Sequence, residues 1–153
     1  MLVRVLYTLA LCLFAAATAA AADEKTTSDN KALQGTWQAV SAEGNGEARP
    51  EDEAKELKVV FEGDEVFAVK PTGEEPRVKF KLDASKKPKT IDLISIEGPD
   101  KGKTAAGIYS LKNGQLRVCI NMFGKDTTQR PKKFKTQAGD GTVLATLERA
   151  KQK

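Results

Sequence analysis

Residues 105–121 read AAGIYSLKNGQLRVCIN and carry the strongest local fold signal in the chain. Two runs in which apolar and polar side chains alternate flank Asn113-Gly114, a pair that favours a type I′ turn because both residues tolerate left-handed backbone angles. A two-residue turn fixes the pairing of its strands, so Tyr109 is predicted to lie opposite Val118. The stretch therefore predicts an antiparallel β-hairpin. Its apolar face consists of Tyr109, Leu111, Leu116, Val118 and Ile120, and its other face carries Ser110, Arg117 and Cys119.

The segments on either side of this hairpin have the same character, with short alternating runs separated by turn residues. In the first run, Trp37, Ala39 and Ser41 are predicted to share one face of a strand. About eight short strands in sequence predict an all-β fold, an antiparallel up-and-down, lipocalin-like barrel with one short helix. An open sandwich is the alternative. The expected strands are 35–42, 57–62, 65–70, 77–82, 90–96, 105–112, 115–121, 131–136 and 142–149, and one helical turn is expected over 50–57.

Residues 1–22 have the three parts of a secretory signal peptide: Arg4, an apolar run over residues 5–17 and alanine-rich cleavage options. A membrane anchor is the alternative, but the apolar run is shorter than the roughly 20 residues that span a bilayer. We therefore expect a cleaved leader, an extracytoplasmic protein (periplasmic or secreted), and a mature chain that does not span the membrane. Residues 23–31 are small, polar and charged, which predicts a disordered tail before a domain over residues 32–150.

The composition argues against several kinds of catalysis and metal binding. The chain has no histidine, which removes the commonest general base and the commonest metal ligand. Leader cleavage would remove Cys12 and leave Cys119 as the single thiol, so neither a disulfide nor a zinc site is expected. We expect no enzyme activity, no cofactor and no metal. An enzyme that uses carboxylates or Cys119 is a less favoured alternative.

Charge is nearly balanced, with 25 basic and 21 acidic residues, but two basic clusters stand out: Lys86-Lys87-Pro88-Lys89 and Arg130-Pro131-Lys132-Lys133. Such lysine-rich loops suit an acidic polymer or a protein partner. The simpler interpretation is that they are solvated loops that protect sheet edges. Nucleic acid is not an expected partner, because base stacking needs aromatic side chains beside the charges and only Phe134 is near.

Five segments along the chain carry a family resemblance. They are 33–37 (LQGTW), 86–93 (KKPKTIDL), 98–104 (GPDKGKT), 107–109 (GIY) and 130–134 (RPKKF). Together they resemble a planctomycete-type domain family of unknown function that is described as lipocalin-like and has no assigned activity. The resemblance spans about residues 33–149. It implies a lipocalin-like barrel from a planctomycete-like bacterium, and it implies no particular function.

Gly35-Thr36-Trp37 near the start of the domain and Arg149 near its end resemble a second group, the calycins. In that group the tryptophan of a first-strand Gly-x-Trp is covered by an arginine from the last strand. The resemblance implies that Arg149 packs over Trp37 as a lid on one end of the barrel, a contact worth about 0.5–2 kcal/mol. The alternative is a core tryptophan and an unrelated surface arginine.

An eight-stranded barrel is wide enough to hold either its own side chains or one small ligand. We therefore predict a non-catalytic binding protein for a small apolar or amphipathic ligand held inside the barrel. A protein- or polyanion-interaction module of the cell envelope, with a filled core, is the alternative. The ligand-lining residues expected from the alternation of faces are Trp37, Phe80, Leu93, Tyr109 and Val118.

Overall fold

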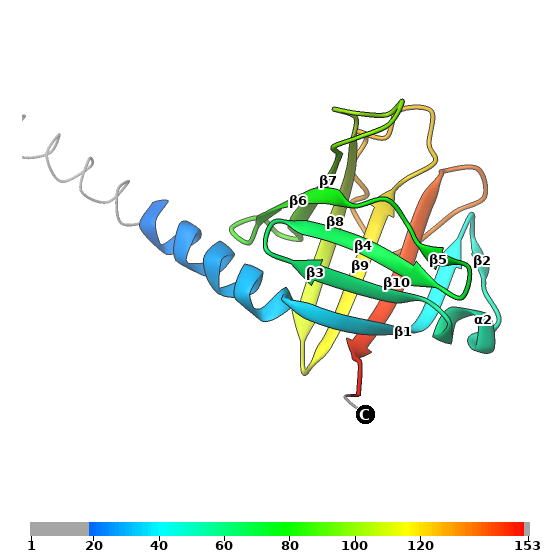
Figure 1. Ribbon diagram of the computed structural model, residues 1–153. Helices are drawn as coiled ribbons and strands as arrows, with labels where there is room; N and C mark the ends of the chain where they lie inside the picture. Colours follow the sequence, from blue (N-terminus) through cyan, green and yellow to red (C-terminus); the bar gives the residue numbers. More distant parts are fainter. Residues whose placement is uncertain (1–18, 152–153) are drawn as a thin grey trace, which may run out of the picture.

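The computed structural model describes residues 19–151 and shows an antiparallel β-barrel with a helix at its N-terminal side (Figure 1). Residues 1–18, which hold most of the expected signal peptide, lie outside the described residues. The elements are β1 (Gly35–Gly44), β2 (Glu47–Ala48), α2 (Glu51–Lys55), β3 (Lys58–Glu62), β4 (Glu65–Lys70), β5 (Gly73–Glu74), β6 (Val78–Asp83), β7 (Lys89–Ser95), β8 (Thr104–Lys112), β9 (Gln115–Asn121) and β10 (Thr142–Arg149).

Eight of these strands form a closed barrel, and the short β2 and β5 are additions to it. Each neighbouring pair is antiparallel, and β1 closes the ring because it pairs with β3 on one side and with β10 on the other. The pairing of β4 with β6 is the shortest in the ring and joins only Glu65 to Lys79 and Val66 to Val78. The all-β, antiparallel up-and-down barrel with one short helix expected from the sequence is confirmed.

The β8–β9 hairpin has the predicted turn and register. Asn113 and Gly114 have φ angles of 53° and 73°, as a type I′ turn requires. Tyr109 pairs with Val118. Here local backbone preference and tertiary structure agree, so the hairpin is confirmed.

Two local expectations were wrong. The register of β1 against β10 shifts between Ala39 and Ser41, so the buried side chain after Ala39 is Ala42 and Ser41 is exposed. An extra residue in one strand reverses the faces that follow it, and simple alternation cannot predict this. The strand expected over residues 131–136 is absent, and these residues belong to a long loop between β9 and β10.

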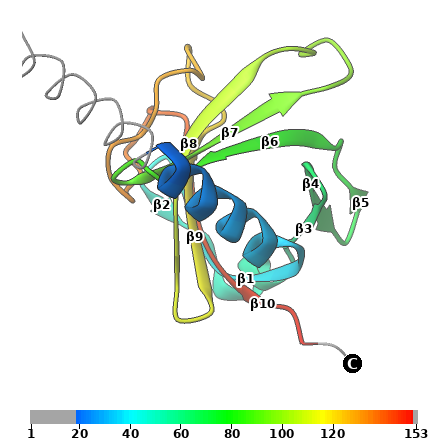
Figure 2. The same ribbon diagram turned by 90° about the vertical axis from the view of Figure 1, so that its left-hand side faces the viewer.

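The N-terminal segment is also different from the expectation, because residues 19–33 form a helix where a disordered tail was predicted over residues 23–31. Figure 2 shows this helix lying across one end of the ring of strands. Leu33 at its end is fully buried, and its carbonyl oxygen accepts a 2.7 Å hydrogen bond from Trp37 Nε1. Thr26 Oγ1 accepts a hydrogen bond from the amide of Ala84, in the β6–β7 turn. The contact with Ala84, 58 residues away, and the burial of Leu33 in the barrel core stabilise a helix that composition alone does not predict.

The inside of the barrel is packed with side chains. The core cluster combines Leu33 of the helix with residues from all parts of the ring, and Phe61 and Phe80 meet edge to face with ring centroids 5.1 Å apart. Such aromatic pairs stabilise a core beyond the area they bury. The buried members of the cluster are Leu33, Trp37, Ala39, Phe61, Val66, Phe80, Leu82, Ile91, Tyr109, Leu116, Ile120, Ala145 and Leu147.

A second buried layer lies on the outer face of β8 and β9, beneath the long loop of residues 122–141. Ile108 and Cys119 are cross-strand partners there and are almost completely buried. Cys119 Sγ lies 3.8 Å from the carbonyl oxygen of Lys135, and the Arg117 guanidinium lies 4.9 Å from the centre of the Phe134 ring. The loop therefore covers a face of the barrel that would otherwise expose apolar side chains.

Burial beneath this loop should make Cys119 unreactive. Burial raises the pKa of its thiol, so little of the nucleophilic thiolate forms near neutral pH. In a Cys12→Ser background, we expect a thiol-modifying dye to react with the native protein about a hundredfold or more slowly than in urea, since reaction requires local opening. Equal rates in the two conditions would contradict the buried position.

Candidate functional site

The five residues predicted to line a ligand pocket lie together, but within the packed core. Trp37, Phe80 and Tyr109 are buried, with 1%, 6% and 1% of their surfaces exposed, and Leu93 and Val118 are partly buried against the same cluster. Their side chains contact the core, so the space inside the ring is filled at these positions. The five predicted pocket residues are therefore part of the packed core and do not line an open cavity.

The Tyr109 hydroxyl, the expected polar group of the pocket, is already engaged by the N-terminal helix. It donates a 2.6 Å hydrogen bond to Asp29 Oδ2, which also forms a 2.6 Å ion pair with Lys89 Nζ. Burial and the Asp29 carboxylate both raise the pKa of Tyr109 well above its ordinary value. The phenol therefore stays protonated and ties β8 to the helix.

Arg149 and Trp37 meet as the calycin resemblance implies. The Arg149 guanidinium lies 4.2 Å from the centre of the Trp37 ring. Its nitrogens also donate hydrogen bonds to the carbonyl oxygens of Ala32 and Gln34, at the junction between the helix and β1. The pair covers the end of the barrel that the helix crosses, and it joins the first and last strands there.

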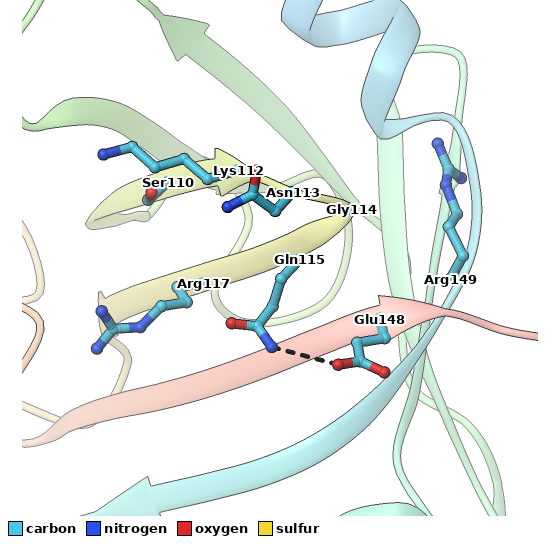
Figure 3. Close-up of a pocket in the computed structure, with 8 residues that line it drawn as sticks. All are labelled: Ser110, Lys112, Asn113, Gly114, Gln115, Arg117, Glu148 and Arg149. Carbon is cyan, nitrogen blue, oxygen red and sulfur yellow. Dashed lines mark hydrogen bonds between the residues drawn. The ribbon is translucent and has the colours of Figure 1, made fainter.

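One surface hollow, of about 700 Å³, lies at the tip of the β8–β9 hairpin (Figure 3). Several of its polar groups are used within the protein. Gln115 Nε2 donates a 3.3 Å hydrogen bond to Glu148 Oε1, and Figure 3 shows the Arg149 side chain turned away towards the helix. The polar side chains left for a ligand are those of Ser110, Lys112 and Asn113, because Arg117 packs over Phe134, so this hollow is the weaker candidate.

A second hollow, of about 740 Å³, lies on the outer face of β6 and β7 and brings the two basic clusters of the sequence together. The β6–β7 turn supplies one side of it, and the first residues of the 130–134 segment supply the other. Lys81 of β6 lies between the two sides. We call this site the lysine cleft and define it by its five basic residues, Lys81, Lys86, Lys87, Arg130 and Lys132.

Four of these cations are free to bind an anion. Lys81, Lys86, Lys87 and Lys132 are exposed and make no ion pair within residues 19–151. Arg130 is different, because its guanidinium contacts Asp92 and two backbone carbonyls. The lysine cleft therefore presents several ammonium groups and no free guanidinium.

The two acids of the cleft are both engaged. Asp83 accepts hydrogen bonds from the hydroxyl and the amide of Ser85, which lower the pKa of its carboxyl. Asp92 pairs with Arg130. A general acid needs a raised pKa near the working pH. Asp83 has the opposite shift, so it is unsuited to that role.

The sequence indicated both basic clusters but did not show that they meet. It missed Lys81 altogether, although alternation along residues 77–82 could have indicated it, since Lys79 and Lys81 leave the core face where Phe80 and Leu82 enter it. Arg130 was counted as one more surface cation, and its contacts with β7 and β8 appear only in three dimensions.

No family model, no curated protein and no solved structure matches this chain. Among residues 19–151, no helix has both the length and the apolar character needed to cross a membrane. Within the same range, no three acidic or cysteine side chains gather as a metal site.

Proposed function

We propose that this protein is a non-catalytic binding module that holds an acidic polysaccharide in the lysine cleft. The observation that carries the proposal is the meeting of two basic clusters, distant in the sequence, around one hollow with four unpaired lysines. Unpaired like charges held close together repel one another, and a bound polyanion relieves that repulsion. The cleft volume falls within the range of roughly 300–1,000 Å³ that is usual for ligand sites, so it suits a short segment of a polymer.

The packing of the core supports this surface site over a small apolar ligand inside the barrel. An interior ligand would have to displace buried side chains such as Trp37 and Tyr109, whose polar atoms already bond to the helix. Emptying a packed core costs several kcal/mol for each large side chain. The structure offers no such obstacle at the lysine cleft.

The chemistry of the cleft favours a polysaccharide over a nucleic acid or a protein. Bases stack on aromatic rings, and no aromatic residue lines the cleft. Protein interfaces usually have large apolar anchors, whereas the exposed large apolar residues of the described chain, Met122 and Phe123, lie outside the cleft. Ammonium groups act as point charges without the planar fork of arginine, so we propose recognition by charge density rather than by the type of anion.

The rest of the proposal concerns where the protein works. Cleavage of the leader over residues 1–22 would place the module outside the cytoplasm, where acidic envelope or extracellular polymers are available to it. Membership of the planctomycete-type lipocalin-like family remains part of the same proposal, supported by the five sequence segments.

Neutralising three lysines of the cleft tests the proposal. We expect K86Q/K87Q/K132Q to bind polygalacturonate and dextran sulfate about tenfold or more weakly than the wild type, since each exposed charge contact contributes roughly 0.2–1 kcal/mol. Isothermal titration calorimetry at low salt measures the difference. Binding by the wild type should also weaken steeply as salt is added.

The matched control removes the same charge elsewhere. K58Q/K101Q/K125Q replaces three exposed lysines that lie outside the cleft and make no ion pair in the described range. The proposal requires this control to bind clearly more tightly than the cleft variant. Equal losses in both variants would show non-specific charge attraction instead. Equal binding of neutral dextran would show that charge does not drive the binding at all.

A further inference from the structure

We infer that the ion pair between Arg130 and Asp92 holds the 130–134 segment in position beside the lysine cleft; we call this pair the latch. Asp92 is therefore required for anion binding, although its own charge is negative. This inference rests on the proposed function, because it assigns a role in polyanion binding to two residues that do not themselves bind the polymer. Both are positioning residues.

The geometry of Arg130 supports the latch. Its Nη2 lies 2.8 Å from Asp92 Oδ1, and its Nη1 donates hydrogen bonds to the carbonyl oxygens of Gly107 at 2.8 Å and Ile91 at 3.3 Å. Ile91 and Gly107 face each other across β7 and β8. One guanidinium thus connects the 130–134 segment to two adjacent strands and to a side chain of the cleft.

The 130–134 segment has few other attachments. It has no regular secondary structure, and Phe134 packs against Arg117. The residues on either side of it are bonded to β9, because Asn121 donates a hydrogen bond to the carbonyl oxygen of Gln129 and the Cys119 thiol lies against that of Lys135. Within the described chain, Arg130 makes the only side-chain hydrogen bonds from this segment to the strands. Lys132, two residues further on, is exposed and lines the lysine cleft beside the β6–β7 turn.

Asp92 serves the latch in a second way. It is the cross-strand partner of Lys81, and side chains in that relation lie within reach of one another. Asp92 Oδ1 is shielded from solvent and accepts no hydrogen bond within the described residues, so the Arg130 guanidinium 2.8 Å away is the charge that compensates it. While Arg130 holds Asp92, Lys81 makes no ion pair and is available to a ligand. Without Arg130, Asp92 would neutralise Lys81.

The test uses two isosteric substitutions with opposite expectations. Asp92→Asn and Asp83→Asn each remove one negative charge from the same cleft, but only Asp92 contacts Arg130. If charge alone matters, both variants bind polygalacturonate more tightly. The latch predicts that Asp92→Asn binds several-fold more weakly than the wild type while Asp83→Asn binds as tightly or more tightly.

A third variant and a ligand-free measurement complete the test. Arg130→Lys keeps the net charge but loses the fork that reaches both carbonyls, and it should also bind several-fold more weakly. Hydrogen exchange at the amides of residues 132–134 should become faster in Asp92→Asn and in Arg130→Lys, with or without polymer. Circular dichroism checks that each variant is folded.

The possible failures are distinguishable. A wild type that binds none of the polyanions overturns the proposed function, whereas the exchange rates still decide whether the latch exists. A wild type that binds, together with an Asp92→Asn variant that binds more tightly and exchanges at the wild-type rate, overturns the latch alone.

Discussion

Replacing Trp37 with alanine is expected to lower the free energy of unfolding by about 3–5 kcal/mol, the usual range for removing a large aromatic side chain from a core. Trp37 is 1% exposed and packs in the main core cluster. The substitution also leaves the Leu33 carbonyl oxygen without its 2.7 Å partner and removes the ring beneath Arg149. Urea denaturation monitored by far-UV circular dichroism measures the loss. Tryptophan fluorescence cannot be used, because the variant lacks the only tryptophan of the chain.

Arg149→Leu is the matched control for this prediction. It removes the guanidinium that covers the indole and leaves the core side chain in place. It also removes the hydrogen bonds to the carbonyl oxygens of Ala32 and Gln34, but these are exposed and water can replace them, so the expected cost is smaller, about 0.5–2 kcal/mol for the cation–π contact. If Trp37→Ala destabilised the protein no more than Arg149→Leu, the indole would be a cover on the barrel end and not a central part of its core.

Gly141→Ala should be the second severe change, with a loss of about 2–5 kcal/mol. Gly141 has a φ of +70°, which a residue with a Cβ adopts only at a cost of roughly 1–2 kcal/mol. A Cβ built there would lie 2.0 Å from the amide nitrogen of Gly124, and overpacking of this kind typically adds about 1–3 kcal/mol. The carbonyl of Gly141 also accepts hydrogen bonds from the amides of Met122 and Phe123, so the long loop cannot shift freely.

Gly139→Ala separates the two causes. Gly139 has a similar φ of +77°, but a Cβ there meets nothing within 4 Å. It should therefore show only the backbone cost of roughly 1–2 kcal/mol. Thermal unfolding of both variants under the same conditions measures the difference. Equal losses would mean that the two ends of the long loop can move apart to accept a methyl group.

Much of the barrel follows from local sequence pattern. Asn113-Gly114 determines its turn by backbone preference, and the alternation around it determines which side chains face the core. The bulge after Ala39 shows the limit of this reasoning, because an inserted residue reverses the faces that follow it. The helix at residues 19–33 shows another limit, since its anchors at Thr26 and Asp29 bind residues that are remote in the sequence.

The candidate site was predictable in parts but not as a whole. Each basic cluster is visible in the printed sequence, and each by itself is typical of a solvated loop. What distinguishes them is their common cleft, together with the engagement of Arg130 by Asp92 and the strand carbonyls. The pocket residues predicted from face alternation do lie together inside the barrel. Alternation cannot show, however, whether the interior of a barrel of this size is filled or open.

The sequence by itself determined the all-β class, most of the strands and the hairpin turn, because these depend on backbone preferences and on side-chain periodicity over a few residues. The pairing of β1 with β10, which closes the ring, is a contact between the two ends of the domain that the sequence left open. Only the tertiary structure decided that a helix crosses one end, that core side chains occupy the interior, and that two lysine-rich segments share a cleft. Those features depend on contacts such as Thr26 with Ala84 and Arg130 with Ile91, 58 and 39 residues apart. Such contacts join residues that are far apart in the sequence, so no local pattern indicates them.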